Sequence, residues 1–212
     1  MDTEQLIRSL AADHGWTVRR VGLLLAGVLG AALVCSVAIF SLTLHMRPDI
    51  HTAMGAPFFL LKFAVTMTLA AASLMVALRL VTPAASVRTL RWLFLLPIGL
   101  LVAGIVADLV VPQTSSWSAR LIGANARVCL VAIPVLSLPL LIAAIAGLRH
   151  GATMRPAATG AVAGLLAGGV AATLYASHCA DDSPLFVATW YTIALALVAL
   201  LGALLGKRFL KF

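Results

Sequence analysis

The chain has 212 residues, of which 62% are apolar and only 10% are charged, and its mean hydropathy is +1.09. Soluble domains carry about a quarter charged residues, so this composition excludes an ordinary soluble domain. The polar remainder is too short for a separate catalytic domain with its own core, and we expect no enzyme activity. The net charge of +8 could suggest nucleic acid, but the basic residues lie at the ends of apolar segments, which indicates membrane topology instead.

The first 20 residues, MDTEQLIRSLAADHGWTVRR, precede the first apolar segment. Leu6, Ile7 and Leu10 recur at helical spacing on one face, and Gly15 ends the pattern, so we predict a short amphipathic helix. A helix of this length is not stable alone in water. Its apolar face is therefore expected to dock into the groove of a partner protein or, alternatively, to lie on the membrane surface.

Six apolar segments follow, each near the roughly 20 residues that a helix needs to cross a bilayer. They are residues 21–44, 57–80, 92–111, 128–147, 157–177 and 185–205. The sequence thus predicts an all-α membrane protein with a six-helix transmembrane bundle at 21–205 and a basic tail at 206–212.

The distribution of lysine and arginine predicts the orientation of these segments. If the N-terminus is cytoplasmic, 11 of the 15 basic residues fall on the cytoplasmic side. Cytoplasmic loops are the more basic ones in membrane proteins. We therefore expect a multi-pass protein of the bacterial inner (cytoplasmic) membrane with both termini in the cytoplasm.

Two charged residues, Lys62 and Asp108, lie inside the second and third segments at a similar depth below the outer surface. Charges at membrane depth are costly and usually paired. We predict a Lys62–Asp108 ion pair that joins the two helices. The alternative is that each side chain reaches the outer surface separately.

The fifth segment carries glycine at every fourth position, namely Gly160, Gly164 and Gly168. This spacing puts the three glycines on one helix face, where another helix can approach closely. We expect that face to pack within the bundle, and a homodimer contact is the alternative.

The link between the fifth and sixth segments, SHCADDSP, holds a thiol, an imidazole and two carboxylates, with no lysine or arginine. Its last three residues, Asp182, Ser183 and Pro184, are typical of a helix start, with the carboxylate at the helix N-terminus. This interpretation leaves His178 and Cys179 unexplained.

Cys129, at the start of the fourth segment, falls on the same outer side as Cys179. The two thiols could form a disulfide, could hold a metal ion transiently with His178 and nearby carboxylates, or could be unrelated. Neither thiol has a diagnostic motif spacing, and we expect no resident cofactor. Cys35, deep in the first segment, is most simply a packing residue.

Several stretches resemble, in order, one known family. They are LIRSLAAD and RR in the head, then RPDI, PFFLLK, RVCLVAIPVLSLPLL, LRHGA, RPAATGAVAGLLAGG, YASHCADDSPLFVATWY and LGALLGKRFLKF. Together they resemble the negative regulator of sigma F family, six-span bacterial membrane proteins that act as anti-sigma factors. The resemblance covers essentially the whole chain.

The resemblance implies that residues 1–20 hold an extracytoplasmic-function sigma factor inactive, with Leu6, Ile7 and Leu10 as the contact. It also implies that Cys129 and Cys179 sense periplasmic metal or redox stress, after which the released sigma factor turns on a stress regulon. The residues alone leave one main alternative, a small-molecule or ion transporter subunit, which requires a polar cavity at the membrane midplane. A haem or quinone enzyme requires histidines within the spans, whereas His45, His51, His150 and His178 lie in loops or at edges.

Overall fold

A computed structural model describes the backbone of residues 3–80, 90–111, 116–151 and 153–210, and the side chains of these residues apart from 3 and 6–21. The side chains of the predicted contact residues Leu6, Ile7 and Leu10 therefore lie outside the described part of the chain. All regular elements within the described residues are helical. In chain order they are α1 (Thr3–Thr43), α2 (Ile50–Ala53), α3 (Pro57–Leu80), η1 (Leu90–Phe94), α4 (Leu95–Val110), α5 (Trp117–Ile122), α6 (Ala126–Leu148), α7 (Pro156–Ala176), α8 (Pro184–Phe186), the π-helical η2 (Val187–Tyr191) and α9 (Thr192–Phe209).

Six stretches of the described chain are helical, long and apolar enough to cross a membrane, as predicted. They are Gly22–Thr43, Pro57–Leu80, Leu90–Val110, Trp117–Leu148, Pro156–Ala176 and Pro184–Phe209. The fourth stretch begins earlier than predicted because it includes the separate short helix α5. The sixth continues into the predicted tail, so Lys207 and Arg208 form part of the last turn of α9.

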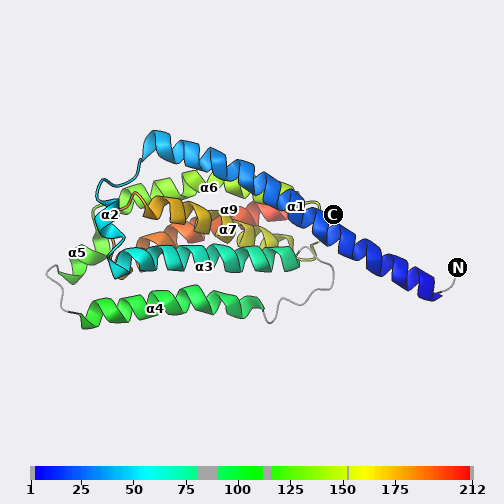
Figure 1. Cartoon of the computed structure of the whole chain (residues 1–212), viewed down its shortest axis with the longest axis horizontal. Helices are drawn as coiled ribbons and strands as arrows, with labels where there is room; N and C mark the ends of the chain where they lie inside the picture. Colours follow the sequence, from blue (N-terminus) through cyan, green and yellow to red (C-terminus); the bar gives the residue numbers. More distant parts are fainter. Residues whose placement is uncertain (1–2, 81–89, 112–115, 152, 211–212) are drawn as a thin grey trace.

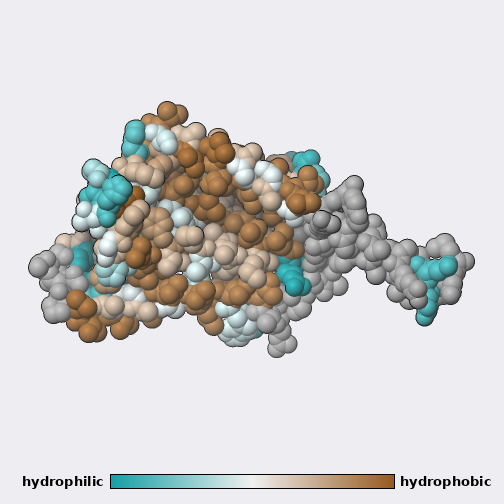
Figure 2. Space-filling view, viewed as in Figure 1, coloured by the Kyte–Doolittle hydropathy of each residue, from teal (hydrophilic) through white to brown (hydrophobic). Residues whose placement is uncertain are grey.

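Helix α7 lies at the centre of the bundle, where it contacts α9, α3 and α6 (Figure 1). Helix α1 packs on α6, and α4 packs on α3 at the opposite edge. Only 22% of the α1 span and 17% of the α4 span are buried, against 56% for α7, so α1 and α4 present most of their surface outward. Figure 2 shows apolar residues covering the side of the bundle, with hydrophilic residues gathered toward its ends. This distribution is the one that a lipid environment favours.

The glycine face of α7 packs against α9 inside the bundle. A Cβ atom on Gly160 would collide with the backbone of Gly202, and one on Gly164 would collide with the backbone at Val198. Gly168 faces the side chain of Leu195 in the same way. Small residues let two helices approach this closely. Because α9 already covers this face, it does not offer a contact to a second copy of the chain.

Helix α1 is continuous from Thr3 to Thr43, so the prediction that the head helix ends at Gly15 is wrong. One glycine inside a helix costs only about 1 kcal/mol relative to alanine, which is not enough by itself to end the helix. Forty-one residues at 1.5 Å each make a helix of about 60 Å, twice the roughly 30 Å of a bilayer core. The N-terminal half of α1 projects beyond the ends of the other helices (Figure 1).

Candidate functional site

The polar chemistry of the described residues concentrates at one end of the bundle, the end that carries α2 and α5 (Figure 1). We call this the loop end. It brings together residues 44–56, residues 116–125 and the link between α7 and α8, which we call the Cys179 loop (residues 177–183). The Cys179 loop is hydrogen-bonded to both of the other segments, as described below.

The Cys179 loop ends in a helix cap formed by a different residue from the one predicted. The Ser183 side chain is the N-cap and accepts a hydrogen bond from the backbone N–H of Leu185 at 3.2 Å, and Pro184 opens α8. The predicted helix start is thus present, but the Asp182 carboxylate is not on the helix N-terminus. It points instead toward two cations.

The first of these cations is Lys62, which is only 1% exposed. Its Nζ lies 2.6 Å from Asp182 Oδ1 and donates a hydrogen bond to the carbonyl oxygen of Cys179 at 2.9 Å. The predicted Lys62–Asp108 pair is therefore wrong. The Cys179 loop returns over α3 and supplies the carboxylate that a buried ammonium needs.

Asp108 pairs with Arg120 instead. Only 12 residues separate the two, because α5 folds back over the end of α4 and brings the guanidinium to the buried carboxylate. The Nη1 group of Arg120 donates to one carboxylate oxygen of Asp108 and, at 3.2 Å, to the backbone carbonyl oxygen of the same residue.

The second cation at Asp182 is Arg47, which the sequence analysis did not single out. Arg47 Nη1 lies 3.0 Å from Asp182 Oδ2, and its Nη2 lies 2.6 Å from Asp49 Oδ2. The hydrogen bond between the Arg47 and Asp49 side chains raises the pKa of Arg47 and lowers the pKa of the exposed Asp49 carboxyl. The backbone N–H of Arg47 also donates to Ser177 O at 3.1 Å. One available signal was that Arg47 is among the few basic residues on the predicted outer side.

Asp181 ties the Cys179 loop to the start of α6. Its carboxylate accepts hydrogen bonds from the backbone N–H groups of Ala124 and Asn125, at 3.1 and 2.8 Å, and from Asn125 Nδ2 at 2.9 Å. Gly123 makes this approach possible, because it has a φ of +62° and a Cβ there would collide with Phe186 and with the Asp181 side chain. Three donors therefore satisfy the carboxylate without any metal ion.

His178 also ties the Cys179 loop to the segment between α1 and α2. Its Nδ1 lies 2.9 Å from the carbonyl oxygen of His45, which can only accept, so Nδ1 carries the proton. His178 thus joins two loops at its own end of the bundle.

The two cysteines predicted to act together lie in one buried cluster at the loop end. Cys129 and Cys179 are both 0% exposed and pack in a cluster with Tyr175, Tyr191 and Phe186. All three cysteines of the chain are free thiols in this structure, and Cys35 is exposed on α1. Burial raises the pKa of the Cys179 thiol although the Lys62 charge acts in the opposite direction. The thiol is therefore protonated and weakly nucleophilic at neutral pH.

The side chains predicted to complete a metal site are engaged elsewhere. His178 bonds to a backbone carbonyl, and both aspartates of the loop are bonded to other donors or cations. Nowhere in the described part of the chain do three or more His, Cys, Asp or Glu side chains gather as a metal site. A cation at Cys129 and Cys179 would need a rearrangement of the loop.

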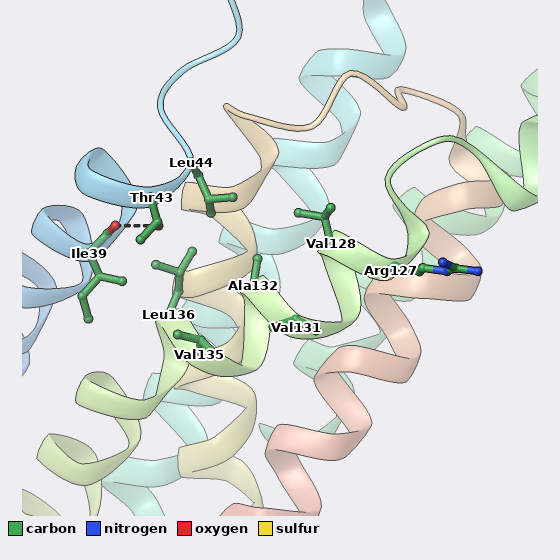
Figure 3. Close-up of a pocket in the computed structure, with 9 residues that line it drawn as sticks. All are labelled: Ile39, Thr43, Leu44, Arg127, Val128, Val131, Ala132, Val135 and Leu136. Atoms are coloured by element: carbon green, nitrogen blue, oxygen red, sulfur yellow. Dashed lines mark hydrogen bonds between the residues drawn. The ribbon is translucent and has the colours of Figure 1, made fainter.

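An apolar groove of about 460 Å³ lies between the loop end of α1 and the start of α6 (Figure 3). It is lined by Ile39, Thr43, Leu44, Arg127, Val128, Val131, Ala132, Val135 and Leu136. The Thr43 hydroxyl donates to Ile39 O at 2.7 Å, and the Arg127 side chain points away from the apolar residues. This lining offers a solute no free polar group, so the groove differs from the polar midplane cavity that a transporter requires.

Comparison with known proteins identifies the family. The family model described as negative regulator of sigma F matches residues 10–212. The chain is 34% identical to the anti-sigma-F factor NrsF of Caulobacter vibrioides (strain NA1000 / CB15N) and 32% identical to the probable anti-sigma-F factor NrsF of Azospira oryzae (strain ATCC BAA-33 / DSM 13638 / PS), and both matches cover the whole of both chains. No solved structure matches this chain. The chain belongs to the negative regulator of sigma F family.

Proposed function

We propose that this protein is a membrane-bound anti-sigma factor that holds an extracytoplasmic-function sigma factor inactive at the bacterial inner membrane. The observation that carries the proposal is the family match over nearly the whole chain, together with two relatives whose names describe anti-sigma-F factors. The six apolar helices support a membrane location. A regulatory role also agrees with the composition, which leaves little room for a separate catalytic domain.

In the proposed orientation both termini lie in the cytoplasm, where a sigma factor is found. The end of the bundle opposite the loop end carries both termini, and we call it the terminal end (Figure 1). The excess of basic residues at the terminal end supports this orientation. The N-terminal part of α1 projects from that same end (Figure 1). It would then reach about 28 Å beyond the membrane span, since residues 3–21 precede that span.

The contact with the sigma factor is the apolar face formed by Leu6, Ile7 and Leu10. An amphipathic helix binds a partner by laying such a face into an apolar groove. A charge on that face would remain unpaired and desolvated in the groove.

The test is to place aspartate at Leu6 or Leu10 and to measure expression from a promoter that depends on the sigma factor. We expect constitutive expression with unchanged amounts of the protein in the membrane. The matched control is Gln5→Asp, which adds the same charge on the opposite face and should preserve repression. Repression that survived both leucine changes would contradict the proposed contact.

The signal is a thiophilic metal ion or an oxidant that reaches Cys129 and Cys179 from the periplasm. Binding of a metal ion would release one proton from each thiol. Oxidation by a peroxide would join the two sulfurs, and the two protons and two electrons removed would convert one hydrogen peroxide into two waters. The shared buried cluster of the two thiols supports their joint action. Either reaction requires the Cys179 loop to open, because both thiols are fully buried.

A further inference from the structure

Among the residues that the structure describes, every hydrogen bond of the Lys62 ammonium goes to the Cys179 loop. The ammonium has three protons, and the three oxygens around it are Asp182 Oδ1 at 2.6 Å, Cys179 O at 2.9 Å and Asp181 O at 3.5 Å. The ammonium also lies 5.3 Å from the centre of the Phe59 ring, which favours a cation. A single side chain from α3 thus bonds to three residues of a loop more than 115 residues away in the sequence.

A lysine at this position carries a cost that an apolar residue would not. Lys62 is only 1% exposed, and a buried ammonium destabilises a protein unless its charge is paired and its protons are bonded. An apolar residue on α3 would pack there without that cost. The bonds from the ammonium to the Cys179 loop offset this cost, and they form only while the loop lies over α3.

That conformation is the one in which Cys179 is hidden. The carbonyl oxygen of Cys179 accepts from Lys62, and its Sγ lies 3.8 Å from the carbonyl oxygen of Asp181, which faces the same ammonium. Arg47 holds Asp182 from the other side of the loop. The loop cannot lift from the bundle and expose Cys179 unless the bonds to Lys62 break first.

We propose that Lys62 is the positioning residue of the Cys179 loop, and that its bonds to Cys179 and Asp182 form a latch that controls how fast reagents reach the Cys179 thiol. The inference rests on the proposed role of Cys179 as a sensor and adds the element that sets its threshold. While the latch is closed, the Cys179 thiol is buried and does not react in the absence of stress. When the latch opens, reagents reach the thiol.

The test measures alkylation of Cys179 by N-ethylmaleimide in native membranes, with the labelled Cys179 peptide quantified by mass spectrometry. Lys62→Met keeps the length of the side chain and removes the charge, and we expect alkylation at least about tenfold faster than in the wild type, equivalent to about 1.4 kcal/mol. The matched control, Arg120→Met, also breaks an ion pair at the loop end. Arg120 and Asp108 line one cavity with residues 180–183, but within the described residues the guanidinium bonds to Asp108 and not to the Cys179 loop. Arg120→Met should leave the rate within about twofold of the wild type.

Two further variants distinguish a specific effect of the Lys62 bonds from a general destabilisation of the loop end. Lys62→Arg retains the charge and donors and should restore most of the protection. Asp182→Asn keeps the loop residue's size and removes its charge, and should accelerate alkylation as Lys62→Met does. Wild-type rates in both Lys62→Met and Asp182→Asn, or equal acceleration in Arg120→Met, would overturn the proposal.

This measurement needs no sigma factor, so it can fail independently of the proposed sensor. If Lys62→Met exposes Cys179 but Cys179→Ser retains the stress response, the latch exists and the sensor is wrong. If Cys179→Ser abolishes the response and Lys62→Met labels at the wild-type rate, the sensor stands and the latch is wrong.

Discussion

The Asp182 carboxylate accepts hydrogen bonds from one buried and one largely buried cation. These bonds hold the Cys179 loop against α3 and against the segment between α1 and α2. Lys62 and Arg47 come from segments more than 100 residues earlier, and both reach the same pair of oxygens. Sequence reasoning correctly required a partner for Lys62, because charges at membrane depth are costly. It chose Asp108 from depth alone. The true partner depends on how the Cys179 loop folds over α3, and local patterns in the sequence contain no information about that contact.

For the cysteines, the sequence predicted their shared side of the membrane but not their burial. The span pattern placed Cys129 and Cys179 on one side of the bundle, and the structure places them in one buried cluster. Their complete burial could not be read from SHCADDSP, whose polar composition suggests a solvated link. The burial arises because Arg47, Lys62 and Asn125 bond the loop down onto the bundle.

The raised pKa of Cys179 predicts a dependence of stability on pH. In the folded protein burial keeps the thiol protonated, whereas in the unfolded chain it ionises near pH 8.5, the value for a free cysteine. The unfolded state therefore loses a proton first, and stability falls as pH rises above about 8.5.

Thermal unfolding of the reduced protein in detergent should thus show a larger loss between about pH 7 and pH 9.5 in the wild type than in Cys179→Ala. Alanine cannot titrate, so it removes this contribution whatever its effect on packing. The same pH dependence in both proteins would show that Cys179 does not titrate as its burial requires.

At the scale of the element, the spans were predictable because bilayer thickness fixes their length. Helix α3 begins and ends at the predicted residues, Pro57 and Leu80. The short helices α2 and α5 were not predicted, since four to six residues are too few for a helical period to show. Helix α1 runs through Gly15, because a single glycine costs a helix only about 1 kcal/mol.

The contact between α7 and α9 gives a prediction at this scale. Gly160→Ala places a methyl group against the backbone of Gly202 and Gly206, so α9 must move away to admit it. We expect a loss of about 1–3 kcal/mol, the usual cost of overpacking.

Gly99→Ala provides the matched control, because no atom lies within 4 Å of a Cβ at that position in α4. Alanine should be neutral or stabilising there by up to about 1 kcal/mol, since it favours the helix. Thermal unfolding in one detergent compares the two variants. Equal stability of both would contradict the close α7–α9 packing.

For the whole molecule, the proposed orientation has the loop end in the periplasm and the projecting part of α1 in the cytoplasm. A signal at Cys179 must then cross the bundle to alter sigma binding, which requires two arrangements of the bundle with different affinities for the sigma factor. The central helix α7 leads directly from the Cys179 loop toward the terminal end.

The orientation is testable with alkaline phosphatase, which is active only in the periplasm. A fusion after Ala180 should be active, and a fusion after Phe212 should be inactive, because the basic residues at the terminal end hold it in the cytoplasm. The reverse pattern of activity would place the head away from any sigma factor.

The most direct test of the central claim is co-purification of a sigma factor from detergent-solubilised membranes. The full-length protein is compared with a variant lacking residues 2–14, which retains all six spans. We predict that an extracytoplasmic-function sigma factor co-purifies with the full-length protein and is lost from the shortened variant, although both are present in the membrane in equal amounts. Equal recovery of the sigma factor with both proteins, or its absence from both, would contradict the account.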